Sequence, residues 1–562
     1  MLRKRWIVPP VISSDADRNL FAFHPVLRQL LFNRGISSDS EARHFLAAEV
    51  DFDTDPYQLV GMEATVDRLC DAIDHKETIA VYGDYDVDGV TATALLVQFL
   101  QFLGATVHPY IPNRFDEGYG LNREALDSLK ADGVGLVVTV DCGIRSPDEA
   151  LYARKIGLDL IITDHHHPLD GSVPPAFAVI CPKQALDSYP DKNLAGVGIA
   201  YKIAQALASK RHVLPSTQQL LDLVALGTVA DLAPLIGENR MLVRSGLQEI
   251  RRSKRQGLFS LANVAELVIG KTTASQIGFI LGPRLNAAGR LDSALAALDL
   301  LMTTDVQEAG RLAQQLDAQN RQRQALTRQT QERAEALAIA EDADPILLFA
   351  VDEDFNAGVV GLAASRLAET YYRPAIVASK GDDQTRGSCR SIPEFHITDA
   401  LDRCADLLVR HGGHAAAAGF TVTNENLPEL RSRLKGLAAA QLGSLDLRPT
   451  LSADVEIKLS ELSFDLFHQL AELEPTGYGN PEAVFVSRRA RVRSSRAVGA
   501  EGRHLKLTFE DERGATVDAI GFRLGQELKD LPAQVDIAYT LEANDYRGRT
   551  TLQLNLKDVR SA

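Results

Sequence analysis

The sequence predicts an α/β protein whose first large domain is built on a parallel sheet. Three short apolar runs, at residues 78–83, 136–140 and 158–163, alternate with stretches of helical pattern. Runs of this length between helices are typical of buried parallel strands. Residues 305–341 have the composition of one long helix, and residues 446–562 turn to short alternating strands. We therefore expect a parallel-sheet domain joined by a long helix to a second α/β domain, followed by a C-terminal β-barrel.

The composition is that of a water-soluble protein with several domains. The chain has 562 residues, too many for one hydrophobic core, and 45% of them are hydrophobic and 24% charged. No apolar stretch is long enough to cross a bilayer, and the basic N-terminus lacks an apolar core of signal-peptide length. The five cysteines have no paired spacing, which argues against a disulfide framework and a zinc motif. These features favour a cytoplasmic protein without a membrane partner.

The charge is negative overall but unevenly distributed. A net charge of −15 argues against a strongly basic nucleic-acid binder. However, the helical stretch at 305–341 concentrates arginines, and local potential rather than net charge steers a polyanion. The sequence therefore does not exclude nucleic acid as a partner. The arginines of this stretch are Arg311, Arg321, Arg323, Arg328 and Arg333.

Five segments follow one another along the chain. Residues 61–304 alternate strand and helix, with a helix predicted at 90–103. In the second α/β region we expect strands at 345–351 and 374–378 with a helix at 358–369 between them. Five short C-terminal strands favour a barrel of the oligonucleotide-binding type, with a structural or protein-binding barrel as the alternative. The expected boundaries are 1–60 for a helical lead-in, 61–304 for the sheet domain, 305–341 for the connecting helix, 342–445 for the second α/β domain and 446–562 for the barrel.

An acidic cluster follows the first predicted strand. Asp84, Asp86 and Asp88 alternate along the chain just before a helix, and alternate positions in extended backbone project to the same side. The segment also begins like a calcium-binding loop, but the twelfth position of such a loop is Leu95 here rather than Glu. We therefore reject the calcium loop and retain two interpretations, a cluster of metal ligands and an acidic helix cap.

The other two predicted strands also end on acidic or histidine residues. Asp141 follows the second strand, and Asp164, His165 and His166 follow the third. In a parallel sheet the carboxyl ends of the strands meet at one edge, where the site lies. Like charges gathered there repel one another unless cations lie between them. The sequence thus predicts a metal centre with more than one ion, for which His and carboxylate ligands suit Mn²⁺ or Mg²⁺.

A fourth apolar run also ends on a carboxylate. Residues 223–230 are mostly apolar, and Asp231 follows them directly, as acidic residues follow the earlier runs. Asp222 precedes this run, and we expect it to be a solvated helix residue. Asp231 therefore joins the candidate ligands, and Asp222 does not.

In this order, the motifs resemble those of the DHH phosphoesterase superfamily. The four motifs are Asp-x-Asp-x-Asp-Gly, Asp-Cys-Gly, Asp-His-His and Gly-Thr-Val-Ala-Asp. Three longer segments resemble the RecJ family of single-strand-specific exonucleases. They are 83–89 (Gly-Asp-Tyr-Asp-Val-Asp-Gly), 282–290 (Gly-Pro-Arg-Leu-Asn-Ala-Ala-Gly-Arg) and 412–420 (Gly-Gly-His-Ala-Ala-Ala-Ala-Gly-Phe). The resemblance covers nearly the whole chain. It implies a DHH domain, a long connecting helix, a DHHA1 domain and a barrel.

The resemblance implies a two-metal site with assigned ligands. Asp141 would bridge two divalent ions, and Asp84 stands where small-substrate relatives carry a histidine. His166 would contact the scissile phosphate or assist proton transfer. The implied metal ligands are Asp84, Asp86, Asp88, Asp141, His165 and Asp231, and the implied catalytic residues are Asp86, Asp88, Asp141, His165, His166 and Asp231.

The resemblance also implies residues that bind DNA. One group would form a pocket for the 5′-phosphate, a second would bind DNA phosphate, and a third would line the path of the strand. Asn356 stands where family members commonly carry a histidine, and it is given no role. The three groups are Arg114, Ser388 and Arg390; Gly412, Gly413 and His414; and Arg284, Asn286 and Arg290.

These implications converge on one expected activity. The resemblance implies a 5′→3′ exonuclease that cuts single-stranded DNA to 5′-mononucleotides in repair and recombination. It also implies cooperation with a single-strand-binding protein and a RecQ-type helicase, and a monomer is the simpler expectation. The alternatives are a DHH phosphoesterase of short oligoribonucleotides or cyclic dinucleotides, and a non-catalytic DNA-binding scaffold. The barrel and Asp84 argue against the first, and the complete ligand set argues against the second.

Overall fold

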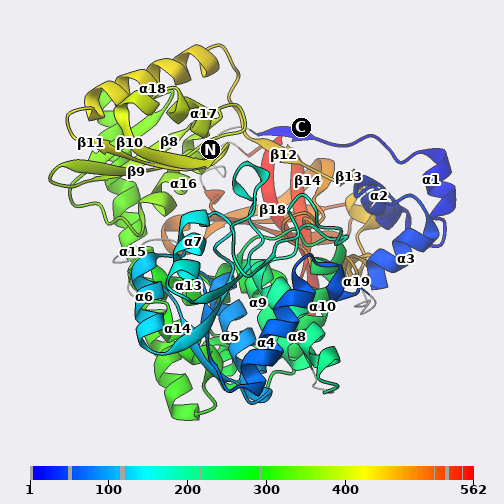
Figure 1. Ribbon diagram of the computed structural model, residues 1–562. Helices are drawn as coiled ribbons and strands as arrows, with labels where there is room; N and C mark the ends of the chain where they lie inside the picture. The colour runs from blue at the N-terminus through cyan, green and yellow to red at the C-terminus, as the bar shows by residue number, and fades with distance from the viewer. Residues whose placement is uncertain are drawn as a thin grey trace. The chain divides into compact units, whose positions relative to one another are not determined.

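The computed structural model divides the chain into two compact units (Figure 1). One unit contains Trp6–Asn286, Ala294–Ala313 and Leu451–Ala562, and the other contains Met1–Arg5, Ala287–Ser293 and Gln314–Thr450. Helix α15 (Val306–Glu341) begins in the first unit and ends in the second. The described residues are 4–47, 54–113, 120–213, 217–291, 293–511, 513–525, 531–546 and 548–562.

A five-stranded parallel sheet forms the base of the first unit. Its strand order is β3-β2-β4-β5-β6, so the order of the chain reverses between β2 and β4. Every neighbouring pair is parallel, and the three strands predicted from apolar runs are confirmed as β2, β4 and β5. A reversal of this kind opens a crevice at the carboxyl ends of the strands. The bounds are β2 (Thr78–Tyr82), β3 (Thr106–Tyr110), β4 (Val134–Val140), β5 (Asp159–Thr163) and β6 (Ala178–Ile180).

Beyond β6 the described part of this domain is helical, so the predicted alternation of strand and helix up to residue 304 is wrong there. The run before Asp231, which we grouped with the strands, is helix α9. Its residues are buried on all sides against α5, α8 and α10, and a Leu- and Ala-rich run of this kind fits a buried helix as well as a strand. The helices of the domain are α4 (Met62–Asp74), α5 (Val87–Phe102), α6 (Arg123–Ala131), α7 (Pro147–Lys155), α8 (Gly196–Lys210), α9 (Leu221–Ala230), α10 (Gly237–Arg251), α11 (Gln256–Val264), α12 (Ala274–Gln276), α13 (Gly282–Leu291) and α14 (Leu295–Met302).

The barrel and the N-terminal helices share one hydrophobic core. The strands follow the order β14-β15-β16-β18-β17, and β17 closes on β14, which is the topology of an oligonucleotide-binding fold. Leu27 and Leu30 of the N-terminal helices pack into the same apolar cluster as Phe485 and Phe509 of the barrel. The bounds are α1 (Ser14–Asn19), α2 (Pro25–Asn33), α3 (Asp39–Ala47), β13 (Val455–Glu456), α19 (Phe464–Ala471), β14 (Phe485–Val498), β15 (His504–Glu510), β16 (Thr516–Gly521), β17 (Gln534–Tyr546) and β18 (Arg549–Ser561).

The second unit is an α/β domain with a mixed sheet. Its order is β10-β11-β9-β8-β7, in which β7 and β8 are parallel and the other pairs are antiparallel. β10 therefore lies at an edge of the sheet. The bounds are β7 (Leu348–Asp352), α16 (Val360–Tyr371), β8 (Ala375–Lys380), β9 (Gln384–Arg390), α17 (Ile397–Asp402), β10 (Leu408–His414), β11 (Ala417–Thr423) and α18 (Leu427–Leu442).

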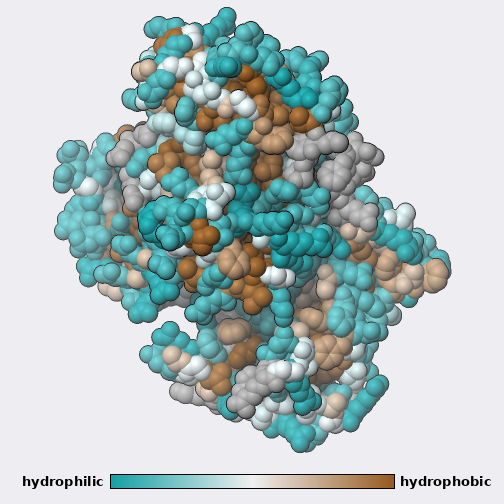
Figure 2. Space-filling view, turned by 90° about the horizontal axis from the view of Figure 1, so that it is seen from below, coloured by the Kyte–Doolittle hydropathy of each residue, from teal (hydrophilic) through white to brown (hydrophobic). Residues whose placement is uncertain are grey.

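Four of the five arginines of α15 pair with acidic residues and the fifth, Arg323, donates to Asn320, so this helix lacks the free basic surface that the sequence indicated. Arg311 pairs with Glu308, Arg321 pairs with Asp317, and comparable ion pairs hold Arg328 and Arg333. The face in Figure 2 is mostly hydrophilic, broken by separate apolar patches. Among the described residues, no helix combines the length and the hydropathy that a membrane crossing requires.

Candidate active site

Asp86 and Asp84 lie in the loop between β2 and α5. Asp86 is the N-cap of α5, and its Oδ1 accepts hydrogen bonds from the backbone N–H groups of Asp88 (2.9 Å) and Gly89 (3.1 Å). The acidic helix cap is therefore observed, and the metal-ligand interpretation remains compatible with it, because a capping carboxylate keeps a second oxygen available. Asn286 stabilises the same loop, since its Oδ1 accepts from the N–H of Val87 at 3.2 Å.

Asp88 is fully buried and is held by the N-terminus of α8. Its Oδ2 accepts from the N–H of Gly196 at 2.6 Å, and its Oδ1 accepts from the N–H of Val197 at 2.9 Å. A Cβ on Gly196 would lie 2.7 Å from the Cβ of Asp141 and 2.9 Å from Asp88 Oδ2. Only glycine lets this helix end approach both carboxylates so closely. Sequence reasoning missed this role, because backbone donors carry no side-chain signature.

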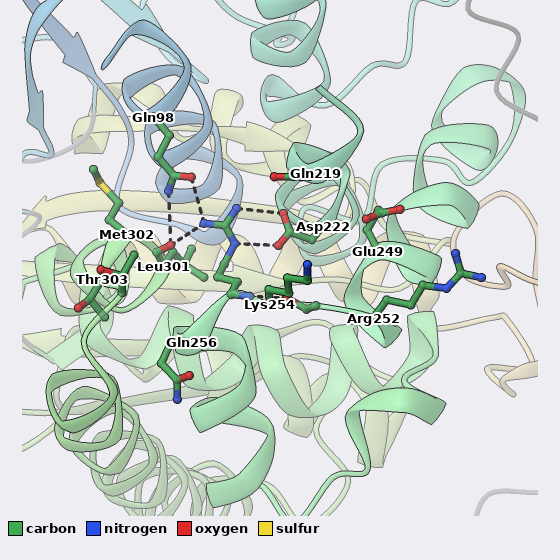
Figure 3. Close-up of a pocket in the computed structure, with 13 residues that line it drawn as sticks. Gln98, Gln219, Asp222, Glu249, Arg252, Lys254, Gln256, Leu301, Met302 and Thr303 are labelled. Carbon is green, nitrogen blue, oxygen red and sulfur yellow. Dashed lines mark hydrogen bonds and ion pairs between the residues drawn. The ribbon is translucent and has the colours of Figure 1, made fainter. Parts of the chain in front are cut away.

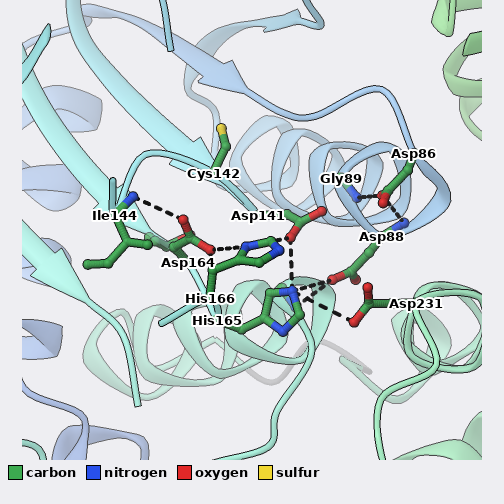
Figure 4. A network of polar contacts seen from close by, with 12 residues as sticks. Asp86, Asp88, Gly89, Asp141, Cys142, Ile144, Asp164, His165, His166 and Asp231 are labelled. Atoms are coloured by element: carbon green, nitrogen blue, oxygen red, sulfur yellow. Dashed lines mark hydrogen bonds and ion pairs between the residues drawn. The ribbon is translucent and has the colours of Figure 1, made fainter. Parts of the chain in front are cut away.

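Asp141 and His165 follow β4 and β5. Asp141 has a left-handed backbone (φ 61°), which is uncommon for a residue other than glycine and is often found at functional sites. His165 Nε2 lies 3.1 Å from Asp141 Oδ1, 3.7 Å from Asp231 Oδ2 and 3.8 Å from Asp88 Oδ2. Asp231 comes from the C-cap of α9. Four different elements thus direct ligand-type atoms toward one point, as Figure 4 shows.

The six predicted ligands form groups with metal-site dimensions. Asp84, Asp86 and Asp141 make one group, and Asp88, His165 and Asp231 make another, each with ligand atoms within 4.8 Å of one another. Asp141 also groups with His165 and His166, so this carboxylate lies beside both sets. Asp141 Oδ1 and His165 Nε2 are buried and neither makes a hydrogen bond, although they lie 3.1 Å apart. Buried polar atoms left in this way fit a pair of bound cations.

The electrostatics of the site also favour cations. Burial, together with the charge of Asp86, raises the pKa of Asp88 to about 7. Burial and the charges of Asp88 and Asp86 raise the pKa of Asp231 to about 9, and the same causes raise the pKa of Asp141 well above its ordinary value. Burial lowers the pKa of His165 to about 3, so this ring is neutral and can act as a ligand. Without cations the site holds protons that bound metal would displace.

His166 differs from its neighbour because a carboxylate orients it. Asp164 Oδ1 lies 2.7 Å from His166 Nδ1, and Asp164 Oδ2 accepts from the N–H of Ile144 at 3.0 Å. Burial opposes a charge on the ring, but the hydrogen bond to Asp164 and the charge of Asp164 outweigh it and raise the pKa of His166. Asp164 was absent from our candidate residues, although its place in the Asp-His-His triplet was a signal for it.

We expect the stability of the metal-free protein to fall as the pH rises. Asp88 and Asp231 have pKa values of about 7 and about 9 in the fold, against about 3.9 in an unfolded chain, so the folded state binds more protons between about pH 4 and pH 9. Its melting temperature in EDTA should be lower at about pH 8.5 than at about pH 6.5, and Mn²⁺ should raise it more at the higher pH.

Thermal melts with and without Mn²⁺ at the two pH values check this expectation. Glu332→Gln, an exposed acid that pairs with Arg328 on α15, serves as the control and should leave the pH dependence unchanged. A metal-free melting temperature that does not depend on pH would contradict the assignment of raised pKa values to the buried carboxylates.

Ser388 and Arg390 lie together on β9 in the second unit. Arg390 donates to Ser388 Oγ at 3.3 Å and to the carbonyl of Cys389 at 2.8 Å. A Cβ on Gly361, in the first turn of α16, would lie 2.9 Å from Ser388 Oγ and 3.3 Å from a guanidinium nitrogen of Arg390. A hydroxyl, a guanidinium and a helix N-terminus therefore converge, which is a combination that binds phosphate.

The remaining predicted DNA-binding residues are dispersed over both units. Gly412, Gly413 and His414 are exposed on the edge strand β10, paired with β11. Arg284 is in α13 and donates to the carbonyl of Ile280 at 2.8 Å. The other two residues are Arg290, also in α13, and Arg114, which lies outside the described residues.

A polar cavity of about 550 Å³ between α5, α9, α11 and α14 lies outside the metal-type groups (Figure 3). Asp222 lines it, and this residue is buried rather than solvated as expected. Its carboxylate forms a bidentate ion pair with Arg255 at 2.7 and 3.2 Å. Arg255 also donates to Gln98 and to the carbonyl of Leu301. These groups satisfy one another, so we interpret this cluster as structural.

The fold and the site define a class of protein. A parallel sheet with two acidic groups at its crevice, joined by a long helix to an α/β domain with a phosphate-type pocket, is a metal-dependent phosphoesterase of the DHH type. Three domain families match the chain: the DHH family N-terminal domain at residues 78–228, the DHHA1 domain at 344–440 and the RecJ OB domain at 453–558.

Similar proteins identify the family within this class. The single-stranded-DNA-specific exonuclease RecJ of Escherichia coli is 37% identical over 561 residues, covering 95% of this chain and 96% of that protein. The corresponding protein of Bacillus subtilis is 38% identical over 540 residues, covering 95% of this chain and 68% of that protein. The crystal structure of RecJ in complex with Mn²⁺ from Thermus thermophilus matches with a TM-score of 0.85 at 32% identity, covering 100% of this chain and 80% of that one. The chain belongs to the RecJ family.

Proposed function

We propose that this protein is a 5′→3′ exonuclease that degrades single-stranded DNA to 5′-mononucleotides. The observation that carries the proposal is a pair of neighbouring ligand groups at the carboxyl ends of the parallel strands: Asp141 belongs to the group with Asp84 and Asp86 and lies 3.1 Å from His165 of the other group. Mn²⁺ or Mg²⁺ fits these donors, and solved RecJ structures similar to this chain are described in complex with each of the two ions. Asp84, Asp86 and Asp141 would hold one ion, and Asp88, His165 and Asp231, with Asp141 shared, would hold the other.

The protein would orient the ligands of these ions and supply a side chain that donates a hydrogen bond or a proton. When bound, two divalent cations generate a nucleophile from water and neutralise charge on the phosphodiester oxygens. The N–H groups of Gly196 and Val197 fix the rotamer of Asp88, so that this ligand is preorganised. His166, oriented by Asp164, which also raises its pKa, would donate a hydrogen bond to the scissile phosphate or a proton to the leaving oxygen.

The polarity of degradation would come from the pocket at Ser388 and Arg390. A terminal phosphate carries more charge than an internal one, and the planar guanidinium suits its oxygens. We expect Arg390→Ala to reduce the preference for a 5′-phosphorylated over a 5′-hydroxyl strand by about 10-fold or more. The ratio of kcat/KM values for the two strands measures this preference.

Arg386 provides a matched control for this prediction. It lies on the same strand and the same face as Arg390, and it is exposed. Arg386→Ala should keep the end preference of the original protein, and Arg390→Ala should keep its Mn²⁺-dependent melting shift. An unchanged end preference in Arg390→Ala would remove this residue from the pocket.

The barrel and the cellular setting complete the proposal. The barrel would hold the single strand, since its fold commonly does so through a basic groove and stacking. All five cysteines are buried and free, which fits a reducing cytoplasm. We further propose that the enzyme acts as a monomer with a single-strand-binding protein and a RecQ-type helicase, because both supply single strands to a nuclease of this specificity.

Digestion of end-labelled DNA tests the proposed function. In Mn²⁺, single strands labelled at the 5′ or the 3′ end are compared with a blunt duplex. Immediate release of the 5′ label as mononucleotide, with the duplex intact, is the expected result. Cleavage of dinucleotides but not of long strands would place the protein with the small-substrate phosphoesterases. Binding of DNA without any cleavage would identify a scaffold.

A further inference from the structure

Tyr478 is an aromatic residue presented to solvent on a rigid turn. Its side chain is 65% exposed and makes no hydrogen bond or ring contact with any other described residue. The turn is closed by two backbone hydrogen bonds between Gly477 and Asn480, and Gly479 has a left-handed backbone (φ 77°). The ring therefore stands at the tip of a tight turn, where burial gives it no stabilising role.

Two buried side chains fix the backbone of this turn. Asn480 is 1% exposed and donates to the carbonyls of Leu473 and Pro475, both at 2.8 Å. Arg240, also 1% exposed, donates to four successive carbonyls, those of residues 472–475, at 2.8 to 3.2 Å. A loop that needed only to connect two elements would not require a buried guanidinium and a buried amide to hold it.

The turn lies directly on the segment that follows the metal-type ligand Asp231. The carbonyl of Tyr478 accepts from the N–H of Leu235 at 2.7 Å, and Gly479 approaches Pro234. Three residues of chain span at most about 11 Å, so Asp231 and Pro234 are no further apart than about three nucleotide steps of a stacked strand. Leu232 lies between them in the sequence and is 68% exposed.

We propose that Tyr478 is a stacking platform for one base of the DNA strand, on the 3′ side of the cleaved phosphate. This inference rests on the proposed function and deepens it. An exposed ring with no partner of its own offers a π-face to an unpaired base, and a duplex keeps its bases stacked on one another instead. The turn precedes β14 and so belongs to the segment that leads into the barrel, which in the proposed function holds the remaining strand. Stacking there would keep the scissile phosphate at the metal centre after each cleavage.

Oligonucleotides that lack one base test the proposal. A tetrahydrofuran residue is moved along the 5′ part of a single strand, and KM in Mn²⁺ and Kd in EDTA are measured for each strand. For the intact strand, Tyr478→Ala should raise both constants by about 10-fold, with kcat lowered by less than KM is raised. In the original protein, a base-free residue at the stacked position should cause a rise of the same size. Tyr478→Ala should show no further rise at that position, since the two changes remove the same contact.

Conservative and control variants separate stacking from structural effects. Tyr478→Phe and Tyr478→Trp keep an aromatic face and should restore both constants. Phe21→Ala removes a ring of similar exposure (75%) near the N-terminal helices and should change neither constant.

Two results would overturn the inference. In the first, Tyr478→Ala has the same KM and Kd as the original protein for every strand. In the second, the base-free residue raises KM and Kd at the same position and by the same factor in Tyr478→Ala as in the original protein. Failure of the proposed function is distinguishable. In that case the original protein would not shorten any strand in Mn²⁺, and the binding constants in EDTA would still decide whether Tyr478 contacts a base.

Discussion

Asp141→Asn is expected to abolish exonuclease activity while leaving the metal-free protein as stable as the original or more stable. The substitution keeps the volume of the side chain, and asparagine tolerates the left-handed backbone at this position better than alanine does. It removes a carboxylate that belongs to one ligand group and lies 3.1 Å from His165 of the other. Charge neutralisation by two ions contributes several kcal/mol to phosphoester cleavage, so a loss of about 10³-fold or more in kcat/KM is expected.

The stability of this variant distinguishes a lost ligand from a damaged fold. In the metal-free protein Asp141 is buried beside the carboxylates of Asp88 and Asp231. Burial is the main cause of its raised pKa, and repulsion from these carboxylates raises the pKa further. A neutral amide relieves this repulsion. The melting temperature in EDTA should therefore stay equal or rise, and the increase caused by Mn²⁺ should largely disappear. Normal turnover by Asp141→Asn would contradict the two-metal assignment.

Arg240→Met is expected to have the largest effect on stability. The guanidinium lies over the ring of Phe45 at 4.0 Å, donates to its carbonyl at 3.1 Å and also donates to the four carbonyls of residues 472–475. Methionine fills much of the volume but leaves these buried acceptors without donors. Because each unsatisfied buried group costs about 1–3 kcal/mol and some of them will reach water, we expect a loss of about 3–5 kcal/mol in the free energy of unfolding.

Trp6 offers a direct probe for this measurement. It is the only tryptophan of the chain, and its Nε1 donates to Asp558 of β18 at 2.6 Å, so its fluorescence reports on the barrel. Urea unfolding followed at this residue should shift to a lower midpoint in Arg240→Met. Arg252→Met, an exposed arginine at the end of the same helix, is the control and should change the free energy by less than about 0.5 kcal/mol. Equal midpoints for the two variants would refute the anchoring role of Arg240.

The strand ends of the site could be predicted because two simple rules coincide there. Short apolar runs identified β2, β4 and β5, and parallel strands necessarily bring Asp84, Asp141 and His165 to one edge. The six predicted ligands do lie together, and their coordination of metal stays a prediction. For Asp231 the residue was identified but its element was not, because a buried helix and a buried strand have the same apolar pattern.

Other features of the site depend on contacts that a linear pattern does not contain. Asp222 looked like a surface residue, yet Arg255, which is remote in sequence, pairs with it in the interior. Helix α8 binds the carboxylate of Asp88 through main-chain N–H groups. Every residue except proline carries such a group, so the sequence does not reveal this contact. The arginines of α15 could be read from the sequence, but the ion pairs that four of them form with acidic residues could not.

The common core of the N-terminal helices and the barrel constrains how this polypeptide can mature. Leu27 and Leu30 are made more than 400 residues before their partners Phe485 and Phe509. Domains usually fold in order as they leave the ribosome, whereas these helices have no core to join until the barrel strands have emerged. The nascent chain therefore carries an exposed apolar segment until the barrel strands have been made. A chain that stops before the barrel would keep that segment exposed, making it a target for chaperones and proteases rather than a smaller working enzyme.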